Sequence, residues 1–298
     1  MLPDGLTAGD KIAIVSPASK IDPALIDACA GAMTREGFIP VVAPHARGES
    51  GSYSASAEDR IADFRDALLD DSIRAIVCSR GGYGAVHLLE QLDRLPDACF
   101  RKWLVGFSDI TALHALFARK GVATLHAAMA KHLGLGHNFA CYDAELAFLR
   151  GELPSQTFPG HEFNRSGEAE GPVVGGNLAV LGGLIGTTFD PIRPGSILFI
   201  EDIAEPIYKV ERILWQLRLR GVFSRISGLM VGRFTDYRPS ADHPDMETMI
   251  HRFLSTLPDF TAPVAFGLPI GHIPDNHPLL LNHPLHLSVT PASTLLRP

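Results

Sequence analysis

The 298-residue chain has little of several features that mark specialised classes of protein. Its four cysteines form no short pairing pattern, so no disulfide framework is expected and the thiols are typical of a reducing compartment. It has no run of lysines or arginines, and its formal net charge of −7 argues against nucleic acid as a partner. No apolar run approaches the ~18 residues that suggest a membrane span.

Targeting, nucleotide and metal signatures are also missing. No basic stretch followed by an apolar one stands near Met1, so we expect no signal peptide, no membrane partner and a cytoplasmic location. Neither G-x-x-x-x-G-K-[ST] nor G-x-G-x-x-G occurs, which disfavours a bound nucleotide. His277, His283 and His286 come without H-E-x-x-H or C-x-x-C, so no metal and no other cofactor is predicted.

The composition is that of an ordinary globular protein, with 46% hydrophobic and 20% charged residues. In the first half, apolar runs alternate with helical patterns. Strands are expected at residues 11–16, 40–43, 73–79, 103–107 and 123–125, and helices at 23–37, 54–69, 84–92 and 109–121. This alternation predicts a parallel sheet covered on both faces, with ligands bound beyond the carboxyl ends of its strands.

The character of the sequence changes at residues 151–172, which are polar, contain prolines and glycines, and show no periodicity. We interpret this stretch as a linker between an amino-terminal domain (1–150) and a smaller α/β domain (173–298). In the second domain, strands are expected at 196–200, 229–231, 264–266 and 285–289, and helices at 177–184, 206–220 and 246–254.

The most informative segment is residues 104–113 (LVGFSDITAL), where an apolar strand gives way to a helix through a turn that carries Ser108. A serine placed there is a candidate nucleophile at the carboxyl edge of the sheet, with helix amides behind it to hold an oxyanion. The alternative is a simple helix N-cap. The second glycine of a G-x-S-x-G elbow is absent, since Ile110 takes its place.

A serine nucleophile needs an imidazole base oriented by a carboxylate. His272 is the base candidate because it follows a strand in the glycine-rich turn GLPIGH, whereas His114 and His126 are expected to face the surroundings of the serine. Glu201 ends an apolar strand and is the acid candidate. Each also has an ordinary interpretation, as a structural histidine or a solvated strand end.

The glycine-rich turn at residues 80–84 (RGGYG) lets backbone amides approach a ligand closely. It predicts a phosphate cradle, one half of an oxyanion hole, or only a sharp turn. The turn follows the third expected strand and Ser108 follows the fourth, so we expect the two turns to lie side by side.

Taken together, the motifs resemble those of the LD-carboxypeptidases, a family of serine peptidases that also contains the microcin C self-immunity peptidases. The resemblance extends from about residue 9 to residue 289. The segments that carry it are SRGGYG (79–84), GFSDIT (106–111), GGNL (175–178), LFIED (198–202) and GLPIGH (267–272).

The resemblance implies an amino-terminal flavodoxin-like parallel-sheet domain (similar to class I glutamine amidotransferases) and a smaller carboxyl-terminal swivelling β/α domain, with the site between them. It implies a triad of Ser108 as nucleophile, Glu201 as orienting acid and His272 as general base. The amides of Asp109 and Gly82 match the oxyanion hole, with Gly81 as the alternative to Gly82. The family is usually homodimeric and free of metal.

The implied reaction is hydrolysis of an L,D-amide that releases the terminal D-Ala of a murein tetrapeptide during peptidoglycan recycling. Arg80 is a candidate for the free carboxylate of such a peptide, against a purely structural ion pair. The alternatives are a microcin-immunity-like peptidase that cleaves aminoacyl- or peptidyl-adenylate analogues, and a ligand-binding module without catalysis. Trp103 and Trp215 are expected on core-like elements, which disfavours nucleobase stacking. The family's His-Gly-Pro-Met is HAAM at residues 126–129, a departure that bears on substrate choice and not on the triad.

Overall fold

The computed structural model describes all residues, 1–298, and the chain divides into two compact units. Unit 1 comprises Met1–Leu153 and His277–Asn282, and unit 2 comprises Pro154–Asn276 and His283–Pro298. No helix of either unit combines the length and the apolar character needed to cross a bilayer.

Unit 1 is built on a six-stranded sheet in the order β11-β5-β4-β3-β1-β2, in which only the pairing of β11 with β5 is antiparallel. Its strands are β1 (Lys11–Val15), β2 (Ile39–Val42), β3 (Ile73–Cys78), β4 (Trp103–Gly106), β5 (Thr124–His126) and β11 (Leu279–Leu281). Its α-helices are α1 (Pro23–Arg35), α2 (Ala57–Leu69), α3 (Leu89–Asp93), α4 (Thr111–Arg119), α5 (Ala130–Leu133) and α6 (Tyr142–Leu149). Short 3-10 helices are η1 (Ala85–Leu88), η2 (Asp97–Phe100), η3 (Ser108–Ile110) and η4 (Gly136–Asn138).

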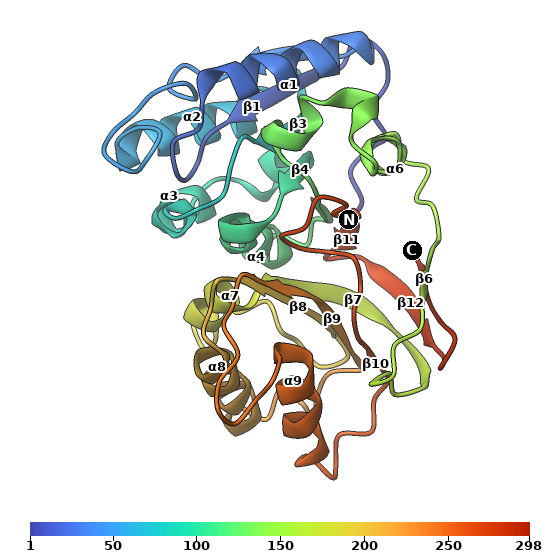
Figure 1. The fold of residues 1–298 in the computed structure, drawn as a ribbon. Helices are drawn as coiled ribbons and strands as arrows, with labels where there is room; N and C mark the ends of the chain where they lie inside the picture. Colours follow the sequence, from blue (N-terminus) through green and yellow to red (C-terminus); the bar gives the residue numbers. More distant parts are fainter. The chain divides into compact units, whose positions relative to one another are not determined.

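The strand order of unit 1 contains a topological switch point. The chain leaves β1 for β2 through α1 and then returns to the other side of β1 through α2, so β1 and β3 flank a topological switch point. Helix α1 contacts α5, whereas α2 contacts α3 and α3 contacts α4, as expected for helices on two faces of one sheet (Figure 1). The order β2-β1-β3-β4-β5 confirms the flavodoxin-like prediction, and ligands of such sheets bind at the carboxyl ends of the strands.

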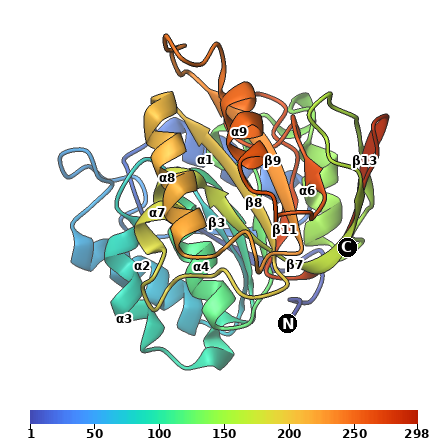
Figure 2. The same ribbon diagram turned by 90° about the horizontal axis from the view of Figure 1, so that it is seen from below.

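Unit 2 contains a seven-stranded sheet in the order β10-β9-β8-β7-β12-β13-β6. Strands β7 to β10 are parallel, and the remaining pairings are antiparallel. Its strands are β6 (Gln156–Pro159), β7 (Gly167–Asn177), β8 (Ile197–Ile203), β9 (Gly228–Thr235), β10 (Val264–Ala265), β12 (Pro284–Val289) and β13 (Ser293–Arg297). Helices α7 (Leu178–Leu184), α8 (Ile207–Leu219) and α9 (Met246–Ser255) lie together over β8 and β9 (Figure 2), and an apolar core fills the space between these layers.

The predicted strands and helices of the amino-terminal half are confirmed to within a few residues. Asp22 caps α1 through a bond from Ala24 N–H to its carboxylate. Two expected helices begin as 3-10 turns instead, η1 before α3 and η3 before α4. Leu69, the last residue of α2, is 47% exposed.

The stretch at residues 151–172 differs from the structureless linker expected from its composition. It contains β6 and the first half of β7, which both belong to the sheet of unit 2. Residues 277–282 also depart from the expected order, because β11 pairs with β5 in the sheet of unit 1.

Candidate active site

Ser108 stands on a strained turn at the carboxyl end of β4. Phe107 is still extended, whereas Ser108 has a φ of 66°, in the left-handed region that a residue with a side chain rarely adopts. Such strain costs about 1–3 kcal/mol and concentrates at functional sites. It turns the chain directly from β4 into η3 and leaves the Ser108 side chain half-buried at the sheet edge.

Ile110 takes the position of the second elbow glycine without disturbing this turn. A Cβ on Gly106, which has a φ of +158°, would come within 3.0 Å of Ile110 Cγ1 and 3.3 Å of Cys78 Cβ. Gly106 thus makes the space in which the fully buried Ile110 packs beneath the elbow. The turn therefore needs its first glycine and tolerates an isoleucine at the second position.

The glycine turn and the serine turn lie side by side in unit 1, as predicted. A Cβ on Gly81 would be 2.7 Å from Ser108 Cβ, 2.9 Å from Ser108 Oγ and 3.2 Å from the backbone nitrogen of Asp109. Asp109 is the second residue of η3, and the first amides of a helix have no acceptor within it. An amide donor and the hydroxyl of Ser108 thus face the same small space beside Gly81.

The Cα of Gly82 packs against Ser19. It has a φ of +103°, and a Cβ there would come 2.3 Å from Ser19 Oγ. Ser19 Oγ accepts the N–H of Tyr83, and Ser19 N–H donates to the carbonyl of Gly81. Ser19, which sequence reasoning missed, thus fixes the turn from its outer side. Its only sequence signal is its place just after the first strand.

Arg80 is exposed, and its Nη1 donates to the carbonyl of Lys20 at 2.8 Å. This backbone contact replaces the ion pair that was the alternative expectation. The rest of the guanidinium remains at the surface of the glycine turn, where it can meet a carboxylate.

In unit 2 the structure brings Glu201 and His272 together. Glu201 is fully buried at the end of β8, and its Oε2 lies 2.8 Å from Nδ1 of His272. The carboxylate accepts and the ring Nδ1–H donates, which leaves Nε2 of the imidazole to take up a proton. Only 14% of the His272 side chain is exposed.

The backbone of the GLPIGH turn is shaped around this pair. Gly271 has a φ of +129°, and a Cβ there would lie 2.8 Å from Glu201 Oε2. Its N–H donates to the buried side chain of Asn276 at 2.8 Å. A glycine is required directly before His272 because any side chain would occupy the place of the carboxylate.

The charges around His272 set its proton affinity. Burial alone lowers the pKa of His272, but the hydrogen bond and the charge of Glu201, with Asp202 and Asp236 further away, raise it above its ordinary value. The imidazolium form is therefore stabilised, as a group that accepts a proton during a reaction requires.

Asp202, the next residue along β8, holds a different element. Its carboxylate accepts the amide of Asn177 and the N–H of Ala179, both at 2.8 Å, and Asn177 in turn caps α7. Burial, and then the neighbouring charge of Glu201, raise the pKa of Asp202 to about 6. The two adjacent acids therefore have different partners. Glu201 binds His272, and Asp202 binds the start of α7. Sequence reasoning did not assign this role.

The other residues considered in the sequence analysis lie outside the candidate site or in the core. His114 is buried between Thr124 and the carbonyl of Gly106, and burial lowers its pKa to about 3, so it is neutral. Cys78 is a buried thiol in the core. Trp103 is fully buried, but Trp215 is 41% exposed on α8, which corrects the expectation that it lies on a core-like element.

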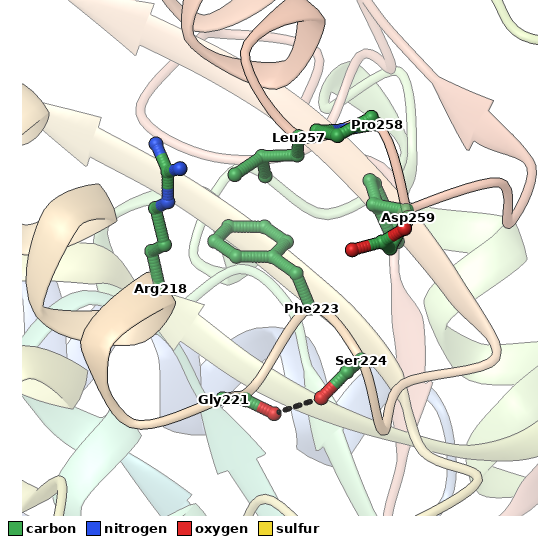
Figure 3. Close-up of a pocket in the computed structure, with 8 residues that line it drawn as sticks. Arg218, Gly221, Phe223, Ser224, Leu257, Pro258 and Asp259 are labelled. Carbon is green, nitrogen blue, oxygen red and sulfur yellow. Dashed lines mark hydrogen bonds between the residues drawn. The ribbon is translucent and has the colours of Figure 1, made fainter.

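The hollow in Figure 3 lies elsewhere in unit 2. It has a volume of about 170 Å³ and is lined by Arg218, Phe223 and residues 257–260. Its loops precede β9 and β10, at the amino edge of the parallel strands, whereas Glu201 lies at the carboxyl end of β8. It is therefore separate from the Glu201–His272 pair. No group of three or more histidine, cysteine, aspartate or glutamate side chains is placed to hold a metal ion.

Comparison with known proteins matches two domain models of one family to most of the chain. The model of the LD-carboxypeptidase N-terminal domain matches residues 12–127, and that of the LD-carboxypeptidase C-terminal domain matches residues 170–287. The murein tetrapeptide carboxypeptidase of Pseudomonas aeruginosa is 32% identical over 278 residues, covering 88% of each chain.

Solved structures agree over nearly the whole chain. The muramoyltetrapeptide carboxypeptidase of Oxalobacter formigenes is 27% identical, with a TM-score of 0.83 and coverage of 96% of this chain and 97% of that one. The wild-type apo microcin C7 self-immunity protein has a TM-score of 0.86 at 22% identity, covering 100% and 98%, and so shares the fold. The two matched domain models and the 32% identity over most of the chain show that this protein belongs to the LD-carboxypeptidase family of peptidases.

Proposed function

We propose that this protein is a serine carboxypeptidase that hydrolyses an L,D-amide and releases the terminal D-Ala of a murein tetrapeptide. Its family and the relatives named murein tetrapeptide and muramoyltetrapeptide carboxypeptidase support this substrate. The wider role is peptidoglycan recycling.

The observation that carries the proposal is the buried Glu201–His272 hydrogen bond. A carboxylate that accepts Nδ1–H of an imidazole fixes the tautomer in which Nε2 can act as a base. Ser108, on its strained turn in unit 1, is the proposed nucleophile for this base, so each unit supplies part of one triad.

In the proposed reaction, Ser108 Oγ attacks the carbonyl carbon of the L,D-amide while Nε2 of His272 accepts the hydroxyl proton. The C–N bond then breaks, and the imidazolium gives this proton to the departing amine, which leaves as D-Ala. Water hydrolyses the acyl-enzyme ester with His272 again as base, and the shortened peptide leaves with a new carboxylate. Glu201 stays ionised throughout and stabilises the imidazolium.

The oxyanion of each tetrahedral intermediate would bind the amide of Asp109 and an amide of the glycine turn. Gly82 is the proposed second donor and Gly81 the alternative. Each donor can contribute about 3 kcal/mol to the stability of the transition state. The close approach of Gly81 to both Ser108 and the nitrogen of Asp109 supports this pairing of turns. Arg80 is the proposed partner of the terminal carboxylate of the substrate.

The proposed setting is the cytoplasm, with the protein acting as a homodimer without a metal. Four free cysteines, three of them buried, suit a reducing compartment. The dimer rests on the family resemblance, and light scattering of the purified protein tests it.

The experiment is a parallel assay of the purified protein with murein tetrapeptide and with an aminoacyl-adenylate analogue. The proposal expects release of D-Ala from the tetrapeptide, which Ser108→Ala abolishes without a change in Tm. Cleavage of the adenylate analogue alone would favour the microcin-immunity-like activity. Binding of the tetrapeptide without turnover would favour a ligand-binding module.

A further inference from the structure

The side chain of Asp109 accepts a hydrogen bond from the backbone that follows the glycine turn, apart from any role of its own backbone amide. The carboxylate is buried, with 3% of the residue exposed, and accepts the N–H of Ala85 at 2.8 Å. This amide belongs to the first residue of η1, directly after the glycine turn. The residue after the nucleophile is therefore tied to the turn that faces the nucleophile.

Arg60 holds the same turn from the opposite side. It is 2% exposed, and its Nη1 donates to the carbonyl of Gly84 at 3.0 Å and to that of Pro17 at 2.7 Å. A Cβ on Gly84, which has a φ of +125°, would lie 2.7 Å from this Nη1. Only glycine therefore lets the guanidinium reach the turn.

Two aromatic side chains fix the guanidinium of Arg60 in place. It lies 4.7 Å from the ring centroid of Tyr53, and its Nη2 lies 3.1 Å from Nδ1 of His87. Since an arginine only donates, Nδ1 of His87 accepts this bond. The titratable groups that face the Asp109 carboxylate are thus Arg60 and His87, with the buried thiol of Cys78 also near it.

We propose that the Asp109 carboxylate and the Arg60 guanidinium are positioning residues that hold the glycine turn at a fixed distance from Ser108. The peptide group that joins Gly84 to Ala85 is held at its N–H by Asp109 and at its carbonyl by Arg60. Because Asp109 carries one oxyanion donor on its own backbone, its side chain sets the separation between that donor and the donor of the glycine turn. Oxyanion holes depend on donors that are placed before the reaction begins. This inference rests on the proposed function.

The test compares Asp109→Asn with a matched control, Asp63→Asn. Asp63 is also a buried carboxylate of unit 1 that accepts a backbone N–H, that of His45 at 3.0 Å, but it holds a different loop. An asparagine at 109 keeps one of the two acceptor oxygens and loses the negative charge that faces Arg60. We expect kcat for D-Ala release to fall about 10²-fold with KM nearly unchanged, because a small misplacement of a catalytic donor has this effect. D63N is expected to keep its kcat, whatever its loss in Tm.

Amide hydrogen exchange provides a readout that does not depend on turnover. Residues 81–86 are expected to exchange faster in D109N than in the wild type, and D63N is expected to leave them unchanged. Faster exchange with an unchanged kcat would overturn the inference, as would equal losses of kcat in D109N and D63N. Should D109N not fold, Arg60→Lys gives the same comparison, because a lysine cannot bridge Pro17, Gly84 and His87 together. A wild-type protein that releases no D-Ala would contradict the proposed function instead, while the exchange data would still report whether Asp109 holds the turn.

Discussion

Gly81 and Ser108 approach each other so closely that a single methyl group on Gly81 would lie 2.7 Å from Ser108 Cβ and 2.9 Å from its Oγ. The same methyl would also press on the backbone nitrogen of Asp109 at 3.2 Å. Real Cβ atoms do not come within 3.0 Å of such neighbours, so one of the two turns would have to move.

Gly81→Ala is therefore expected to lower kcat by about 10²–10³-fold, the loss typical of a damaged oxyanion hole. Gly31→Ala is the control, because its Cβ would make only ordinary contact with Arg35 in α1. This control is expected to retain full activity and to gain up to about 1 kcal/mol in stability. Wild-type turnover in Gly81→Ala would mean that the catalytic groups lie elsewhere.

Glu201→Gln is expected to reduce kcat on the order of 10⁴-fold while the fold persists, because the amide no longer fixes the imidazole tautomer or stabilises its positive charge. Steady-state kinetics and thermal unfolding of the same preparation measure both quantities. Glu170→Gln, at an exposed position on β7 of the same unit, is expected to change neither. A loss of less than tenfold in Glu201→Gln would contradict the role given to the carboxylate.

The pH dependence of kcat/KM follows from the raised pKa of His272. The base must be neutral to accept a proton, and Glu201 raises its pKa above the ordinary value of about 6.5. Activity is therefore expected to be full at alkaline pH and to be lost as the pH falls through a midpoint above about 6.5. Glu201→Gln is expected to move that midpoint toward lower pH, and a midpoint that stays in place would exclude His272 as the titrating group.

Arg80→Ala is expected to raise KM for the tetrapeptide about tenfold, with a smaller change in kcat, because a charge-assisted hydrogen bond is worth about 1.5–3 kcal/mol. A tetrapeptide whose terminal carboxylate is amidated makes the comparison specific. The wild type and Arg80→Ala are expected to bind that peptide equally well. An equal effect of the mutation on both peptides would assign Arg80 a purely structural role.

The amino-terminal sheet could be predicted because its inner strands are buried on both faces and consist of continuous apolar runs. The edge strand β2 is also an apolar run, although Ile39 and Val41 are exposed. Strand β7, with the sequence GEAEGPVVGGN, has no such run, since much of its length is glycine or charged. Its backbone is needed at positions such as Gly175, where a Cβ would come 2.0 Å from the carbonyl oxygen of Phe199. Close packing of this kind depends on a partner strand that the local sequence does not reveal.

Some parts of the candidate site could likewise be predicted from the local sequence, and others could not. The turn at Ser108 and the neighbouring glycine turn follow from strand ends that meet at one sheet edge. Glu201 and His272, 71 residues apart, were candidates because each follows a strand, and the family resemblance then implied that they act together. The hydrogen bonds of Asp109 and Arg60 to the Gly84–Ala85 peptide were missed because an acid after a nucleophile and an arginine on a helix have many ordinary uses.

The central claim is that Ser108 and His272, which belong to different units, act together in one catalytic triad. Residues that act as a unit lose activity together, so a second removal adds little to the first. The decisive measurement is kcat for D-Ala release by Ser108→Ala, His272→Ala and the double variant. The account predicts that all three fall to a similar residual rate, whereas losses that multiply in the double variant would show that the two side chains work independently and would contradict it.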